Sequence, residues 1–167
     1  RPELRRRSRS RDGLGGAEMT FYDPKICDRV IKLEYHGVIY SKKNSKRIIT
    51  NSRTGKPQII SNDNAKAQEM SMTWAFREQA VNKGWFFDED PKEYEGRFFG
   101  IAVEIYQQNR RRRDLDNQLT AILDGLVAAH ALPDDSNKFV REIRVFDRGI
   151  DKKDPRAIIH IGEVSYE

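Results

Sequence analysis

Apolar and polar residues alternate along two segments of the chain, the pattern of strands with one buried face. Ile31, Leu33 and Tyr35 alternate with polar or charged residues, and residues 99–106 repeat the same period of two. Successive side chains of a strand point to opposite faces, so this alternation predicts half-buried strands. Residues 140–146 and 157–164 bring the predicted set to about four strands.

A first helix is predicted between two polar signals. Asn62 or Asp63 is suited to cap a helix that runs to about Lys83, where Gly84 supplies a stop signal. The apolar residues of this segment fall roughly on one stripe: Ala67, Met70, Trp74 and Val81.

A second helix has the clearer periodicity. Residues 115–127 repeat apolar side chains at helical spacing, and Asp116 or Asn117 lies where the cap should be. About four strands and two main helices predict a single small α+β domain with a mixed sheet over residues 19–167. The apolar positions of the second helix are Leu115, Leu119, Ile122, Leu123, Leu126 and Val127.

Polar segments separate these elements. Residues 1–18 are rich in arginine, serine and glycine and hold almost nothing that packs, which predicts a disordered basic arm or a leftover from expression, with Met19 as a candidate initiator. Residues 37–56 are polar and strongly basic, and a turn is predicted at residues 54–57. Residues 88–95 have the composition of an acidic loop.

Composition and charge bound the class of protein. The chain has 167 residues, of which 37% are hydrophobic and 34% charged, as in one soluble domain. No apolar run approaches the roughly 20 residues of a membrane span, and no secretory signal is evident, so no membrane partner is expected. The single Cys27 fits a reducing cytoplasm. Residues 1–18 hold six arginines and three acidic residues, +3 of the net charge of +5, so local clusters matter more than bulk charge.

The most informative motif lies just before the second helix, at residues 110–117. Four arginines directly precede Asp114 and Asp116. On an extended segment these two carboxylates would point the same way, with Cα atoms roughly 7 Å apart, close enough to reach one ion. Mg²⁺ prefers one or two carboxylates together with water and phosphate oxygens. The motif therefore predicts a Mg²⁺ site, with Mn²⁺ as a second candidate ion, beside a strip that binds a polyanion.

Simpler explanations exist for each acidic residue. An aspartate before a helix commonly caps it, and Asp114 is also explained by surface pairing with an arginine. Asp134 and Asp135 are equally suited to a turn or to a second cap. Thr120 and Asp124 follow the motif along neighbouring positions of one helix, a spacing typical of a solvated face.

Other site chemistry has less support. His36, His130 and His160 are widely separated and have no Cys or His at zinc-ligand spacing. The sequence has no Gly-x-Ser-x-Gly motif and no glycine-rich phosphate loop.

Taken together, these segments resemble the RusA family of phage and bacterial Holliday junction resolvases over roughly residues 31–164. The likeness rests on the Arg-Asp-Leu-Asp-Asn core at residues 113–117, on Asp124 within Ile-Leu-Asp-Gly-Leu, on Leu-Pro-Asp-Asp at residues 132–135 and on the strand at residues 140–145. Residues 40–47 are similar to a loop of that family that contains serine, lysine and asparagine.

The resemblance implies a homodimeric, Mg²⁺-dependent endonuclease of a bacterial or phage-infected cell that nicks branched DNA and resolves four-way junctions. It implies that Asp114, Asp116 and Asp135 hold the metal and carry the catalysis, and Asp124 and Asp134 are candidates to support them. The family's lysine on the first turns of the helix falls at Thr120 here, and Lys138 is a candidate to replace it. The residues expected to contact DNA phosphates are Lys42, Lys43, Asn44, Lys46, Arg47, Arg110, Arg111, Arg112 and Arg113.

Two other functions remain open at this point. The threonine at position 120 is compatible with a non-catalytic nucleic-acid-binding module on the same fold. The Asp-x-Asp motif also suits a metal-dependent phosphohydrolase that acts on nucleotides, although the long basic stretch of residues 42–47 favours a longer polyanion. A two-fold dimer suits a four-way junction, because it presents two identical sites to two related strands.

Overall fold

The computed structural model describes residues 27–40, 46–61, 63–88, 90–111 and 113–164. For residues 27, 28, 46, 47, 59–61, 63 and 64 the description covers the backbone alone. The predicted arm at residues 1–18 therefore lies outside the described residues, as do Lys42, Lys43, Asn44 and Arg112.

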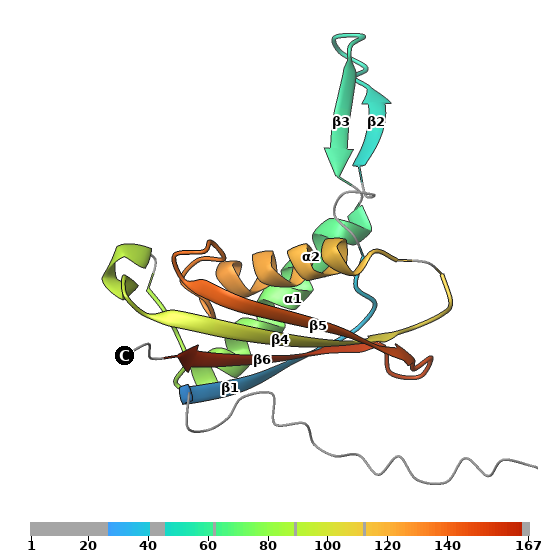
Figure 1. The fold of residues 1–167 in the computed structure, drawn as a ribbon. Coiled ribbons are helices and arrows are strands. Elements are labelled where there is room, and N and C mark those ends of the chain that lie inside the picture. Colours follow the sequence, from blue (N-terminus) through green and yellow to red (C-terminus); the bar gives the residue numbers. More distant parts are fainter. Residues whose placement is uncertain (1–26, 41–45, 62, 89, 112, 165–167) are drawn as a thin grey trace, which may run out of the picture.

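The predicted strands assemble into one mixed sheet, which confirms the expected α+β class. Its strands are β1 (Cys27–His36), β4 (Phe98–Gln107), β5 (Val140–Ile150) and β6 (Arg156–Val164), in the order β1-β6-β4-β5. Strand β6 is antiparallel to both of its neighbours, whereas β4 and β5 are parallel. Helices α1 (Asp63–Asn82) and α2 (Leu115–Ala128) cover one face of this sheet (Figure 1).

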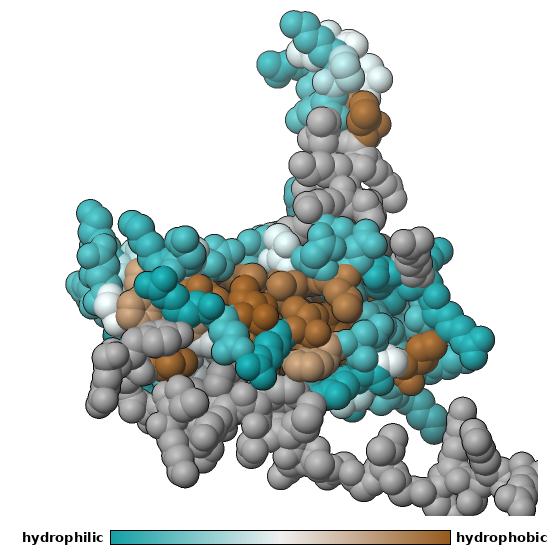
Figure 2. All heavy atoms as spheres, viewed as in Figure 1, coloured by the Kyte–Doolittle hydropathy of each residue, from teal (hydrophilic) through white to brown (hydrophobic). Residues whose placement is uncertain are grey.

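The register of the sheet aligns the apolar residues of its covered face. Ile31, Ile161, Ile101 and Ile143 form one row across the four strands. The first three are buried, and Ile143 on the edge strand β5 remains 39% exposed. Apolar side chains gather in Figure 2 over the region of α2 and β5, within a largely hydrophilic surface.

The face that α1 turns toward the core differs from the apolar stripe seen in the sequence. Met72, Phe76 and Ala80 are buried, whereas Met70 and Trp74 are 65% and 70% exposed. The buried face of α1 also carries glutamines whose amides bind backbone groups. The buried Gln68, for example, accepts a hydrogen bond from the Tyr40 amide and donates one to the Tyr40 carbonyl. These polar residues interrupt the apolar period, so the stripe of Ala67, Met70, Trp74 and Val81 is the solvent side of the helix.

A hairpin lies where the sequence predicted only a polar basic segment and a turn. Strands β2 (Lys46–Thr50) and β3 (Pro57–Ser61) pair with each other and project from the body of the molecule (Figure 1). The predicted turn is present, with Gly55 at a φ of +67° that favours glycine. Ile48 is 76% and Ile49 40% exposed, so the described side chains of this hairpin form no buried apolar face that a sequence pattern would reveal.

The remaining elements match the sequence closely. The acidic loop contains a short 3₁₀ helix, η2 (Pro91–Tyr94), with Asp90 at its N-cap. Within the described part of the chain, neither helix is long and apolar enough to cross a bilayer.

The two helices touch at Gly125, and this contact generates a stability prediction. A Cβ added there would lie 3.1 Å from Met72 Sδ and 3.4 Å from Phe76 Cε2. We expect Gly125→Leu to lower the free energy of unfolding by about 1–3 kcal/mol, because the larger side chain forces α1 away. Urea unfolding measures the change. Gly125→Ala is the control. Its free energy of unfolding should stay nearly unchanged, because about 1 kcal/mol of helix propensity gained by alanine offsets the tighter contact with α1. Equal stability of Gly125→Leu and Gly125→Ala would contradict this packing.

Candidate functional site

The connection from β4 through α2 to β5 determines where the predicted site residues lie. At the carboxyl end of β4, Gln107 Nε2 donates a hydrogen bond of 2.9 Å to Gln118 Oε1 in the first turns of α2. At the amino end of β4, the Phe99 amide donates a hydrogen bond of 2.7 Å to the Phe139 carbonyl, just before β5. The start of α2 and the segment that leads into β5 are therefore at opposite ends of the sheet.

Asp114 occupies the N-cap of α2, two positions before Asp116, the earlier of the two caps that the sequence suggested. The prediction of Asp116 or Asn117 as the cap is wrong, because the helix already begins at Leu115. Asp114 has an extended backbone, but its carboxylate makes no capping hydrogen bond; Oδ2 instead accepts from Asn117 Nδ2 at 3.3 Å. The capping explanation for this carboxylate therefore does not apply.

Asp116 is exposed in the first turn of α2, so the two aspartates do not share one extended segment as expected. The extended backbone ends at Asp114, and the helix takes Asp116 onto the flank that also carries Thr120. The Thr120 hydroxyl donates a hydrogen bond of 2.9 Å to the Asp116 carbonyl. Asp124, one turn further along, is half-buried.

The neighbouring Asn117 carries an unusual buried acceptor. The side chain is only 8% exposed, and within the described part of the protein its Oδ1 atom has no hydrogen-bond partner. Leaving a buried acceptor without a donor costs about 1–3 kcal/mol. A bound cation or a donor group on a ligand would remove that cost, so this atom indicates a binding site at the start of α2.

Asp134, Asp135 and Lys138 lie beyond the other end of α2, in the loop before β5. A helix of 14 residues spans about 21 Å. Within one chain, α2 therefore separates Asp135 from Asp114 and Asp116, and Lys138 is equally remote from the helix start. Asp134 Oδ2 accepts a bond from the Ser136 amide at 3.4 Å, as in a turn.

The carboxylates at the start of α2 are of the type that Mg²⁺ takes in its sparse binding mode. No group of three or more His, Cys, Asp or Glu side chains within the described residues is arranged to hold a metal. Mg²⁺ in proteins often takes only one or two carboxylates and completes its shell with water and phosphate oxygens. Asp114 and Asp116 are exposed carboxylates of that kind, and the next residue, Asn117, carries the unpartnered Oδ1 acceptor.

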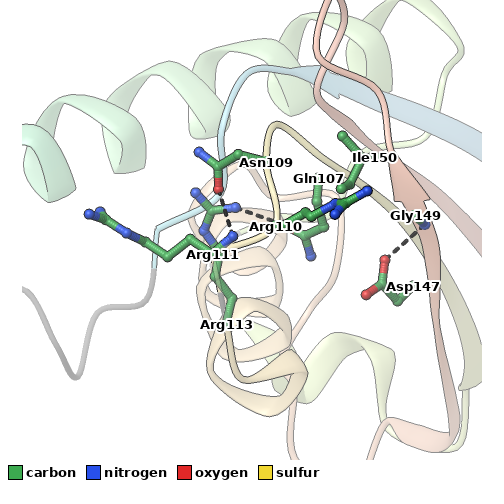
Figure 3. Close-up of a pocket in the computed structure, with 8 residues that line it drawn as sticks. All are labelled: Gln107, Asn109, Arg110, Arg111, Arg113, Asp147, Gly149 and Ile150. Carbon is green, nitrogen blue, oxygen red and sulfur yellow. Dashed lines mark hydrogen bonds between the residues drawn. The ribbon is translucent and has the colours of Figure 1, made fainter.

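An arginine pocket opens next to this helix start. We give that name to a pocket of about 460 Å³ between the ends of β4 and β5 (Figure 3). The guanidinium of Arg113 donates to Gln107 Oε1 at 3.1 Å and is thereby fixed, while the Arg111 amide binds Asn109 Oδ1 at 3.0 Å. The lining residues are Gln107, Asn109, Arg110, Arg111, Arg113, Asp147, Gly149 and Ile150. The pocket thus concentrates positive charge beside the two aspartates.

Part of the predicted DNA-binding set falls outside this description. Lys42, Lys43, Asn44 and Arg112 are not among the described residues, and Lys46 and Arg47 are described only as the backbone that begins β2. The hairpin adds exposed cationic side chains, Arg53 and Lys56, that the sequence argument did not select.

The three histidines belong to ion pairs and packing contacts. His36 lies 2.7 Å from an Asp154 oxygen, and this hydrogen bond raises the pKa of the imidazole above its usual value. Burial instead lowers the pKa of His160, which lies beside Glu104. His130 has a φ of +57°, and its Nδ1 lies 3.1 Å from the Phe87 carbonyl oxygen.

Sequence reasoning missed the contribution of β5 to the pocket. Asp147, Gly149 and Ile150 reach the arginines only because β4 and β5 pair in parallel and end together. It also missed Gln107 and Gln118, since an isolated glutamine has no sequence signal for burial. Neither a comparison with protein-family models nor one with curated proteins finds a match to this chain.

The unpartnered Oδ1 atom of Asn117 leads to a prediction about stability. We expect Asn117→Leu to raise the free energy of unfolding by on the order of 1 kcal/mol, because the variant no longer buries an unsatisfied acceptor. Denaturant unfolding in metal-free buffer measures this. Gln118→Leu is the matched control in the next position, where every hydrogen bond is satisfied and stability should fall. A loss of stability in both variants would show that the Asn117 amide is structural.

Proposed function

We propose that this chain is a Mg²⁺-dependent, structure-selective endodeoxyribonuclease of the RusA type that nicks branched DNA as a homodimer. The observation that carries the proposal is the start of α2, where Asp114, Asp116 and the free Asn117 Oδ1 lie beside the arginine pocket. Hydrolysis of a phosphodiester needs such a pairing, because the substrate is an anion whose charge increases toward the transition state.

Each side chain has a role in this proposal. Asp114, Asp116 and Asn117 would hold the ion, and the chemistry that bound Mg²⁺ supplies is polarisation of the scissile phosphate and activation of water. Arg113, fixed by its hydrogen bond to Gln107, would offset the charge that develops on the phosphate. Arg110 and Arg111 would contact neighbouring phosphates, which positions DNA without reading its sequence.

The reach of the positive surface favours a polynucleotide over a single nucleotide. The hairpin projects from the body and carries Arg53 and Lys56, and its first strand begins with Lys46 and Arg47, the last two residues of the basic stretch 42–47. A nucleotide would occupy the arginine pocket alone, whereas a branched DNA would also pass along the hairpin. This difference in extent favours the nuclease over the nucleotide phosphohydrolase.

A homodimer would bring Asp135 into the same site. Two copies of α2 packed antiparallel about a two-fold axis place the end of one helix beside the start of the other. A surface for such packing exists: Leu119 and Val127 of α2 and Val145 of β5 are half-buried, and Ile143 is 39% exposed. We call these four residues the α2–β5 patch. Each site would then combine Asp114 and Asp116 of one subunit with the partner's Asp135.

Nicking of a synthetic four-way junction tests the function directly. We expect cleavage of the junction in Mg²⁺, none in EDTA, and far less cleavage of a linear duplex of the same sequence. Binding of the junction without cleavage would instead support the non-catalytic module. Release of phosphate from nucleotides with intact DNA would support the phosphohydrolase.

Asp116→Asn should abolish nicking while junction binding survives or tightens. The change removes a metal ligand and also relieves repulsion between this carboxylate and the DNA phosphates. Single-turnover cleavage and a binding titration separate the two effects. Glu78→Gln neutralises an exposed carboxylate on α1 and should behave as the unaltered protein does. Normal nicking by Asp116→Asn would remove Asp116 from the site.

Mixing two inactive variants tests the shared site. If each site combines residues of two subunits, a heterodimer of Asp116→Asn and Asp135→Asn retains one intact site and one site with both changes. We therefore expect the mixture to recover nicking at one strand, while neither variant alone cleaves. Adding Ile143→Glu to both variants should prevent dimer formation and abolish the recovery. If heterodimers form and nicking is not recovered, a site does not combine Asp116 of one subunit with Asp135 of the other.

A further inference from the structure

A chain of buried amides connects the arginine pocket to the segment that precedes the basic residues 42–47. Gln118, only 1% exposed, donates from Nε2 to the Ile39 carbonyl at 3.0 Å. Its Oε1 accepts from Gln107 Nε2 at 2.9 Å, and Gln107 Oε1 accepts from the Arg113 guanidinium at 3.1 Å. Both glutamines are buried, so this chain of hydrogen bonds is shielded from competing water.

The same segment is held from the other helix as well. Gln68 of α1 accepts from the Tyr40 amide at 2.6 Å and donates to the Tyr40 carbonyl at 3.2 Å. Residues 39 and 40 thus have their backbone groups bound by glutamines from both helices. The amide chain that ends at Arg113 is therefore anchored at its other end to a backbone segment that both helices hold.

We propose that Gln107 and Gln118 are positioning residues that hold Arg113 in register with the aspartates. This inference rests on the proposed function, because the position of Arg113 matters only if a polyanion binds beside the aspartates. Gln118 is suited to the role since its own helix begins with Asp114 and Asp116. Its bond to the Ile39 carbonyl anchors the pair of glutamines to the body of the protein.

A purely structural role would give a different pattern of effects. An arginine that samples many rotamers loses side-chain entropy on binding, whereas one fixed by a buried acceptor has already lost it. Removing the amides should therefore weaken DNA binding through Arg113, not only destabilise the fold. This loss of DNA affinity should disappear in a variant that lacks the Arg113 side chain.

The experiment compares Gln118→Met and Gln107→Met with the unaltered full chain on a synthetic four-way junction. Methionine has a similar length but no amide. At a temperature where circular dichroism shows every variant folded, we expect junction affinity without metal to fall about tenfold in each. The slope of log affinity against log salt should also fall by about one, as one phosphate contact is lost.

Gln79→Met is the matched control. Gln79 makes the same kind of contact, accepting from the Glu34 amide at 2.8 Å and donating to the Glu34 carbonyl at 2.7 Å, but its described hydrogen bonds do not lead to Arg113. We expect Gln79→Met to lose stability while retaining affinity and salt slope. An equal loss of affinity in Gln79→Met, or unchanged affinity in both Gln118→Met and Gln107→Met, would overturn the inference.

A double-mutant cycle separates this inference from the proposed function. In an Arg113→Ala background, Gln107→Met should have no further effect on junction affinity, because the residue through which it acts is gone. Additive losses would overturn the positioning role. Binding is measured without Mg²⁺, so a protein that binds junctions but never nicks them would overturn the proposed nuclease while this result stands by itself.

Discussion

The parallel pairing of β4 with β5 is the constraint on which the rest of the structure depends. Parallel neighbours cannot be joined by a tight turn, so the chain must cross the sheet, and here α2 makes that crossing. The crossing places the start of α2 at the carboxyl ends of both strands. Crevices outside the carboxyl ends of parallel strands commonly receive ligands, and the arginine pocket lies at such a position. The same helix carries the second acidic pair, Asp134 and Asp135, to the far end.

Buried polar groups in this core divide into satisfied and unsatisfied ones, and the division separates structural from functional candidates. The amide of Gln118 is completely bonded, and its burial therefore costs little. The amide oxygen of Asn117, one position earlier, has no donor among the described residues. Both residues have similar sequence context and similar burial. This difference in hydrogen bonding is the basis of our proposals that Gln118 holds the site together and that Asn117 binds at it.

Local patterns in the sequence predicted the elements that have one apolar face. The four strands and both helices follow from alternation, from helical periodicity and from the stop at Gly84. Elements without such a face were not predicted: the hairpin exposes Ile48, and the buried face of α1 includes polar Gln68 and thus hid its true orientation. The cap of α2 was misplaced because Asp114, Asp116 and Asn117 are all good caps by type.

The sequence predicted only the part of the candidate site that is formed by residues adjacent in the chain. Asp114, Asp116 and the arginines are adjacent in the chain, so their proximity needed no knowledge of topology. Asp135 is 19 positions beyond Asp116, and its distance from the site depends on a helix whose length places the two groups at opposite ends. A chain that separates two acidic groups by one helix length can still unite them, because an antiparallel pair of identical helices exchanges their ends. In the proposed homodimer, two-fold symmetry would give the separation within one chain a chemical meaning, whereas in a monomer Asp135 would be an ordinary turn residue.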